Sequence, residues 1–502
     1  EESQSHGSEE DISSDDESME GDRLLTITEA GGIMPLVNLL TTGGVAAKEH
    51  AAAALWHLAL DTSNQLGIAR ANGVAPLVAL LDEGSYLAVT NGANALARLA
   101  EVNTDNQAQI AKRLVSLLVS ESPGAQERSA QAMWALAAGQ PSSPLVIVNA
   151  GAISPLVNLL SIGTLKAKEQ AAGALSTLAS ASENNQLAIA IGLVTLLGSG
   201  DTDGQEHATK LLLHLAADHE NRTAIAAAGA IKRLVEQLKS TSVLVQELSA
   251  SVLTHLIVGG GDNVTECAAC GGIKPLVALL SSPSLVAQAE AAQVLADMTK
   301  GSDELSAENQ ASVAREGGIG PLVSLLTTAG ADGKSAAAGA LWSLARGLPE
   351  TQAAVADAGA VQPLVSLLLS EDAKQQLKAA GAISGLVAGN PINQDSVKSA
   401  GGIPPLVALL HTAHRDVQAH AANALAELCR EHTKNQTAMA AARAIEPLIA
   451  LLQLRPSPQE RDVADRKKNQ TISLAKEMSA GAIWCLSDRH FNNQSAVADA
   501  SG

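Results

Sequence analysis

Gly32-Ile33-Met34-Pro35-Leu36-Val37-Asn38-Leu39-Leu40 is a stretch that returns along the chain and decides its fold. It recurs as Gly73-Val74-Ala75-Pro76-Leu77-Val78-Ala79-Leu80-Leu81. Marking each copy by the Leu of its Pro-Leu-Val step, or by the matching Leu, gives eleven copies separated by 37 to 46 residues: Leu36, Leu77, Leu114, Leu156, Leu193, Leu234, Leu276, Leu322, Leu364, Leu406 and Leu448. A fixed period in this range is typical of helical solenoids, in which each repeat packs only on its neighbours. The period therefore predicts a long binding surface and not an enzyme with one pocket.

The composition favours small, closely packed helices. Apolar residues make up 46% of the 502 residues, yet the chain has only four Trp, one Tyr and one Phe. Packing must then rest on Ala, Leu, Val and Ile. Four Cys, no signal-like start and no apolar run of the roughly 18 residues that a membrane span needs indicate a reducing compartment. We expect a cytoplasmic protein, with the nucleus as the alternative, and no membrane span.

The charge is concentrated at the N-terminus. The chain carries a net charge of −19, and residues 1–22 hold ten acidic residues and no Lys or Arg, which leaves −9 for the rest. An acidic, Ser-rich stretch cannot bury enough apolar surface to fold. We therefore predict a disordered tail over residues 1–23 and an array of repeats over residues 24–502. An acidic array with few aromatic residues also argues against a nucleic-acid partner.

Each repeat is predicted to contain three helices. In one copy, Asn64-Gln65 opens a short helix, Ala71-Asn72-Gly73 ends it, and Pro76 lies in the first turn of a second helix. Asn is a good N-cap, Gly permits a sharp turn, and Pro is tolerated where its missing N–H has no intrahelical partner. A longer third helix follows, as in 48–59, with apolar residues at helical spacing. Around Leu114 and Leu193 the Gly turn is missing, so we expect the first two helices there to fuse or shift.

The triplet, with Gly-Gly-Ile-x-Pro-Leu-Val-x-Leu-Leu followed by Lys-Glu-x-Ala-Ala-x-Ala-Leu, closely resembles the armadillo repeat. The resemblance covers nearly the whole chain and is closest to plant and protist arrays. It implies an all-α, right-handed superhelical solenoid of about eleven three-helix repeats, whose third helices line a concave groove that holds extended peptides or partner helices.

The groove positions can be projected onto the third helices. Importin-alpha proteins carry a Trp followed four residues later by an Asn on successive third helices. Here Trp stands at that position only at Trp56, Trp134, Trp342 and Trp484, and no Asn follows it, so a carrier of nuclear localisation peptides is not expected. The four Trp residues either contact a peptide or fill gaps between helices.

Basic residues occupy the second projected position in three repeats. These residues, Lys300, Arg346 and Arg430, predict a basic strip for an acidic partner segment. The alternative is ordinary solvated charge at helix C-termini, which the helix dipole favours.

Other motifs do not carry chemistry. Cys267-Ala268-Ala269-Cys270 supplies half of a zinc site at most, and Cys270 stands where other copies have Ala, so we interpret it as a packing residue. Gly333-Lys334-Ser335 lacks the first Gly of a phosphate loop. The twelve His residues are scattered. We therefore expect no catalytic residues, no metal, no cofactor and no small-molecule substrate.

The sequence thus predicts a non-enzymatic scaffold or adaptor that binds a protein partner. Two alternatives stay open: the substrate-binding region of a ubiquitin ligase whose catalytic-partner domain lies outside this chain, and a component of a cytoskeletal or flagellar assembly. The chain begins at Glu1 without a Met, so flanking domains such as a U-box are left open. Ser13 and Ser14, followed by carboxylates, suit an acidophilic kinase, and the tail either competes with an acidic partner or only solvates the array.

Overall fold

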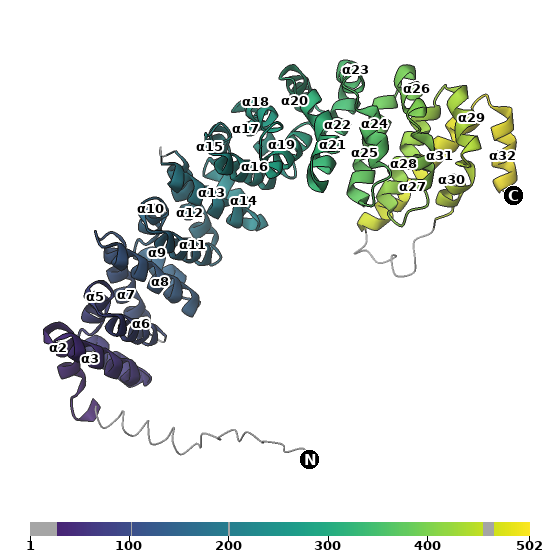
Figure 1. Cartoon of the computed structure of the whole chain (residues 1–502). Coiled ribbons are helices and arrows are strands. Elements are labelled where there is room, and N and C mark those ends of the chain that lie inside the picture. The colour runs from purple at the N-terminus through teal and green to yellow at the C-terminus, as the bar shows by residue number, and fades with distance from the viewer. Residues whose placement is uncertain (1–27, 102, 199–200, 455–465, 502) are drawn as a thin grey trace, which may run out of the picture. The chain divides into compact units, whose positions relative to one another are not determined.

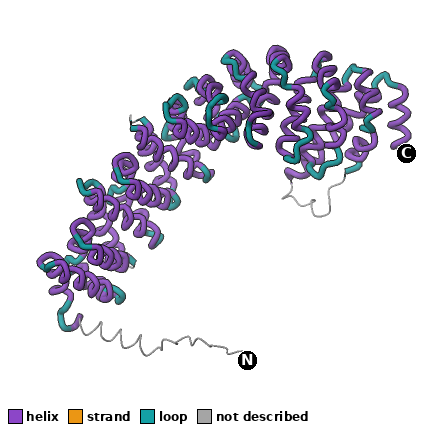
Figure 2. The backbone as a smooth tube through the Cα atoms, in the orientation of Figure 1, coloured by secondary structure: helices purple, strands orange, loops and turns teal. Residues whose placement is uncertain are grey.

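The structure is a computed structural model that describes residues 28–101, 103–198, 201–454 and 466–501. Within these ranges the chain is built of helices joined by short turns and contains no strand (Figures 1 and 2). It divides into two compact units, residues 1–230 and residues 231–502, which we describe separately. The all-α solenoid predicted from the period is confirmed.

The helices of the first unit follow one another in the order expected for a repeat array. They are α2 (Ile33–Thr42), α3 (Val45–Leu58), α4 (Thr62–Arg70), α5 (Val74–Glu83), α6 (Tyr86–Ala100), α7 (Thr104–Leu118), α8 (Pro123–Gly139), α9 (Ser143–Asn149), α10 (Ile153–Ile162), α11 (Leu165–Ala179), α12 (Glu183–Leu197), α13 (Thr202–Ala216) and α14 (His219–Ala227).

The second unit repeats the same pattern. Its helices are α15 (Ala230–Gln237), α16 (Val243–Ile257), α17 (Asp262–Ala269), α18 (Ile273–Leu279), α19 (Leu285–Met298), α20 (Glu304–Arg315), α21 (Ile319–Thr328), α22 (Ala331–Gly347), α23 (Pro349–Asp357), α24 (Val361–Leu367), α25 (Ala373–Val387), α26 (Pro391–Ser399), α27 (Ile403–Leu409), α28 (Arg415–Cys429), α29 (Thr433–Ala441), α30 (Ile445–Leu452), α31 (Arg466–Ser487) and α32 (Phe491–Ser501).

The helices α4, α5 and α6 show one complete repeat. The marker residue Leu77 on α5 is fully buried, as are its counterparts in the other repeats except Leu36, which is partly exposed. Leu55 and Leu58 of the preceding third helix α3 are buried too. The third helices of the first unit are α3, α6, α8, α11 and α13, and those of the second unit are α16, α19, α22, α25, α28 and α31. The repeat core is therefore made of aliphatic side chains.

Two neighbouring positions make the turn between the first and second helices, for different reasons. The first has a left-handed backbone, with φ of 59° at Asn72 and 76° at Gly31, which disfavours most side chains. The second, Gly73, has an ordinary helical φ of −67°. A Cβ there would lie 2.7 Å from the Cγ2 of Ile68, so this glycine is needed for close approach.

The Asn that recurs in the first helix of the repeats is not its N-cap, so this prediction from the sequence was wrong. Asp61 caps α4, accepting hydrogen bonds from the backbone N–H groups of Ser63 at 2.9 Å and Asn64 at 3.0 Å. The corresponding Asn106 lies inside its helix and donates to the carbonyl oxygen of Leu99 at 3.0 Å. The last carbonyls of a third helix have no intrahelical partner, and burial at the repeat junction keeps water from them. The Asn amide satisfies them.

Two repeats depart from the three-helix pattern, as the missing Gly turn predicted. A single helix, α7 or α12, takes the place of the separate first and second helices found elsewhere. The expected fusion is confirmed. The repeat count of about eleven stays a prediction.

We expect the two fused repeats to be the weakest points of the array. Local opening is easiest where a helix has fewer packed neighbours. Backbone amides of α7 and α12 should exchange hydrogen for deuterium faster than those of α21 to α28. Exchange followed by mass spectrometry measures this difference, and equal protection in both groups would contradict the prediction.

Some expectations lie outside the described residues. They are the tail over 1–23 that we predict to be disordered, with Ser13 and Ser14, and residues 24–27 of the predicted array. In the described ranges no single helix is long and apolar enough to span a membrane. Taken together, α9 and α10 have the length and composition of a span, but the chain bends by 79° between them.

Candidate partner-binding groove

The seven residues predicted for the groove lie on or just after third helices, and the structure separates them into different surroundings. Trp56 and Trp134 lie on α3 and α8 in the first unit. Trp342 and Arg346 lie on α22, Arg430 directly follows α28, and Lys300 lies two residues after the end of α19. The last residue, Trp484, lies on α31 and exposes 64% of its surface.

Trp342 lies against glycine on the next third helix. A Cβ built on Gly381 of α25 would lie 2.6 Å from the Cδ2 and Cε2 atoms of the Trp342 ring. A Cβ on Gly385, one turn later, would lie 2.9 Å from the Cγ of Arg346. The two glycines therefore let α22 and α25 approach closely, with the tryptophan and the arginine stem lying across α25.

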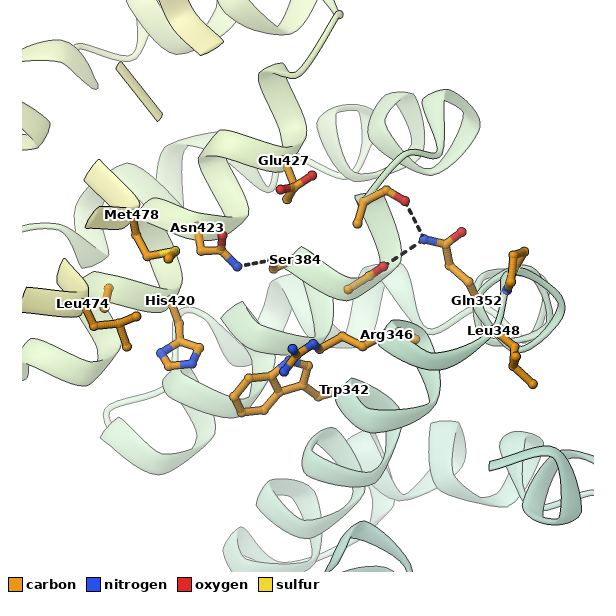
Figure 3. A pocket seen from close by; sticks show the side chains of 15 residues that line it. Trp342, Arg346, Leu348, Gln352, Ser384, His420, Asn423, Glu427, Leu474 and Met478 are labelled. Atoms are coloured by element: carbon orange, nitrogen blue, oxygen red, sulfur yellow. Dashed lines mark hydrogen bonds between the residues drawn. The ribbon is translucent and has the colours of Figure 1, made fainter. Parts of the chain in front are cut away.

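Two cations lie over the Trp342 ring. The Arg346 guanidinium carbon is 5.9 Å from the ring centroid, and the Lys378 ammonium nitrogen is 5.5 Å from it. Both distances are within the range of cation–π contacts. The His420 ring from α28 meets the same indole edge-on, with centroids 4.9 Å apart at 86°. Figure 3 shows Arg346 and His420 beside the Trp342 ring.

Lys378 is a half-buried cation without a carboxylate partner among the described residues. Burial lowers the pKa of its ammonium group, and the nearby charge of Lys300 lowers it further, whereas Asp297 acts in the opposite direction. The positive charges of Lys378 and Lys300 therefore lie near each other, and the charge of Asp297 offsets them only in part. Burial also lowers the pKa of His420.

The groove contains a cavity of about 480 Å³ between α22, α25, α28 and α31. Its lining includes Trp342, Arg346, Ser384, Asn423 and Glu427, together with Leu474 and Met478 from α31 (Figure 3).

Fixed hydrogen bonds hold the polar side chains at this cavity. The Asn423 amide donates to the Ser384 hydroxyl at 2.7 Å. The amide of Gln352, another lining residue, donates to the carbonyl oxygens of Gly385 and Ala388 at 2.9 Å each. These bonds set the walls of the cavity in place before any ligand binds.

Arg430 differs from the other two predicted basic residues because its charge is balanced locally. It forms an ion pair with Glu427, with nitrogen and oxygen 2.7 Å apart. The structure therefore places Arg346 and Lys378 over Trp342, with the charge of Lys300 acting on Lys378, and pairs Arg430 with Glu427. The projection from the sequence included Arg430 in the basic strip because it could not show this ion pair.

The tryptophans of the first unit lack this cationic setting. Trp134 lies over Gly173 of α11, whose Cβ would be 2.7 Å from the ring, and donates to the Thr177 hydroxyl at 3.1 Å. Trp56 stacks on His57 with centroids 5.0 Å apart. Trp134 thus fills space between third helices as Trp342 does, but no cation–π contact is found for it in the described ranges.

Projection of the sequence missed Lys378, Gly381, His420 and Asn423. The projection used two positions of each third helix, and these residues occupy others. The spacing of Gly381 and Gly385, four residues apart in a third helix, was the available signal for close approach. Elsewhere, Cys270, which we interpreted as a packing residue, is only partly buried. Its neighbour Cys267 is buried, and burial raises the pKa of that thiol to about 12.

Comparison with known proteins identifies the repeats. The family model described as Armadillo/beta-catenin-like repeat matches residues 141–180, 218–258, 306–346, 349–388 and 390–430. No match was found among curated proteins.

Solved structures also resemble the chain. The crystal structure of an engineered protein from the Northeast Structural Genomics Consortium is 32% identical, with a TM-score of 0.57, and covers 79% of this chain and 98% of that one. A designed armadillo repeat protein is 27% identical over 47% of this chain and 99% of its own, with a TM-score of 0.43. Another, in complex with the peptide (KR)4, is 27% identical over 47% and 98%, with a TM-score of 0.42.

Proposed function

This chain belongs to the armadillo-repeat proteins, and from that premise we propose that its second unit binds an extended, acidic segment of a partner protein in the groove around Trp342. The observation that carries the proposal is the half-buried Lys378 ammonium, held with Arg346 over one indole ring and lacking a carboxylate among the described residues.

An uncompensated, partly desolvated cation gains most from an anionic ligand. Removing charge from water is costly unless a partner of opposite charge replaces the water. Lys378 and Arg346 face the same ring, and Lys300 adds a further positive charge near Lys378. A carboxylate side chain of a partner compensates this group.

Polar groups beside the cations favour an extended segment. The Asn423 carbonyl oxygen has no hydrogen bond within the described residues, and the Ser384 hydroxyl accepts from Asn423 while its own proton stays available. An acceptor and a donor at neighbouring points of the groove match the N–H and C=O groups of an extended backbone. A helix satisfies these backbone groups internally and gains nothing from them.

A peptide-binding assay tests the proposal. The probe is a fluorescein-labelled 12-residue peptide with Glu at every third position in a Gly/Ser background, and fluorescence anisotropy measures its affinity. We expect binding by the full chain, and at least a tenfold weaker affinity after Trp342→Ala, because the cations lose the ring that supports them.

Trp134→Ala is the matched control for this assay. It removes a tryptophan that lies on glycine in the same way but makes no cation–π contact with any described residue. Its affinity should stay within twofold of the unaltered chain. Equal losses in both variants, or tighter binding of the corresponding Lys peptide, would rule out this site.

A further inference from the structure

The fused helix α7 leaves an open cleft in the first unit. A cavity of about 1140 Å³ lies between the third helices α6 and α8. On its other side α8 packs directly on α11, where the Trp134 ring lies against Gly173. The cleft therefore occupies a place where this fold normally has contact between neighbouring third helices.

The walls of the cleft carry small side chains, and its floor is apolar. Ala97 on α6 and Ala135 on α8 line it and are exposed. Beneath them lie the buried side chains of Leu96, Ile110 and Leu114. Small walls over a leucine-rich floor leave room for apolar side chains inserted from outside.

Charged residues surround the cleft, but each is already paired. Glu127 forms an ion pair with Lys166 at 2.9 Å, and Glu101 forms one with Arg98 at 2.8 Å. Arg128 donates to the carbonyl oxygens of Leu81 and, at 3.1 Å, Asp82, where α5 ends without intrahelical partners. Among the described residues, the carboxylates that line the cleft are thus ion-paired and the Arg128 guanidinium is held by backbone carbonyl oxygens, so the cleft suits an uncharged apolar surface.

The length and walls of the cleft select the form of the ligand. Its lining runs from Tyr86 to Ala100 on α6 and from Glu127 to Gly139 on α8. A helix of 15 residues is about 22 Å long at 1.5 Å per residue, so the cleft accepts a helix of similar length. Thr90, Asn94 and Gln131 also line the walls, but the alanine-lined part offers no partner for a peptide backbone, whereas a helix satisfies its own backbone groups.

We propose that the cleft between α6 and α8 binds an amphipathic helix of a partner protein, which inserts a ridge of apolar side chains between Ala97 and Ala135. The bound helix lies along α6 and α8 and supplies the packing that the fused repeat lacks. This site is independent of the groove around Trp342 and takes a partner of different chemistry.

Model helices test this proposal on the full chain. The probes are three fluorescein-labelled 18-residue peptides with Leu along one helical face and Gln, Lys or Glu on the other. Because the charges around the cleft are paired, we expect the three affinities to agree within about threefold. A fourth peptide with the composition of the Gln peptide but with Leu spread around the helix should bind at least tenfold more weakly.

Substitutions in the walls locate the binding. Ala97→Arg and Ala135→Arg should each weaken the Gln peptide at least tenfold. Ala138→Arg, which is on the same helix but does not line the cleft, should leave its affinity within twofold. Trp342→Ala should also leave it unchanged, which separates this site from the groove in the second unit.

Hydrogen exchange on the unaltered chain gives a result that does not depend on the variants. The Gln peptide should slow exchange in α6 and α8 of the first unit. Protection confined to other helices, a tenfold preference for the Lys or Glu peptide, or equal binding of the peptide with spread Leu would each overturn the proposal.

Discussion

Replacing Arg346 and Lys378 together with Glu should weaken binding of the acidic peptide at least 100-fold. Both cations lie over the Trp342 ring, and no carboxylate in the described chain lies within ion-pair distance of Lys378. A hydrogen bond to a charged group contributes about 1.5–3 kcal/mol, so losing two such contacts and adding repulsion exceeds the 2.7 kcal/mol that a 100-fold change requires. Fluorescence anisotropy at low and high salt measures the effect.

The control for this variant changes the net charge by the same amount elsewhere. Lys274→Glu with Arg315→Glu reverses two exposed cations away from the third helices. We expect less than threefold weaker binding for this pair, since exposed charges act over a distance that salt shortens to about 10 Å at 0.1 M. If both pairs weaken binding equally, the peptide responds to net charge and not to this groove.

A third variant separates charge from packing. Lys378 is half-buried, so Lys378→Glu also disturbs the contacts of its aliphatic stem. Lys378→Met keeps a chain of similar length and removes only the charge. It should weaken binding about tenfold while the helical circular dichroism and the melting curve stay unchanged.

Gly381→Ala should destabilise the second unit and remove peptide binding together. The new Cβ would lie 2.6 Å from the Trp342 ring, a separation that forces the indole away from α25 and from both cations. Overpacking of this kind costs about 1–3 kcal/mol, and the helix propensity of Ala offsets about 1 kcal/mol at most. The expected net result is lower stability and at least a tenfold loss of affinity.

Gly339→Ala is a close control because it makes the same change on the preceding third helix, α22. Its Cβ would meet only the flexible end of Lys378, at 3.5 Å from Cδ, which is an ordinary contact. Here the propensity gain stands alone, and we expect about 0.5–1 kcal/mol of added stability with binding retained.

Stability in this pair is best measured locally. Long repeat arrays do not always unfold in one step, so hydrogen exchange in α22 and α25 is a clearer readout than a single melting temperature. Gly173→Ala, which crowds Trp134 at 2.7 Å, should destabilise the first unit and spare binding of the acidic peptide. If hydrogen exchange in α22 and α25 is the same in Gly381→Ala as in the unaltered chain, Trp342 moves without loss of stability and the prediction is wrong.

The sequence identified the side chains of the groove only in part. Its period assigned Trp342 and Arg346 to a third helix, α22, and Lys300 to the turn after α19, because a helical repeat carries each position to an equivalent place. It could not place Lys378, which reaches the same indole from the neighbouring helix. It also counted Arg430 as a free cation, whereas Glu427 neutralises it through a contact within one turn of α28.

The sequence by itself determined the all-α solenoid, the three-helix unit and the two fused repeats, because these follow from helical period and turn chemistry within a few residues. The tertiary structure decided what lies between helices. It assigned the repeated Asn to the carbonyls of a preceding helix, brought Lys378 to Trp342 and opened the cleft between α6 and α8. These features depend on how closely two helices approach, and that distance is set by side chains separated by roughly one repeat along the chain.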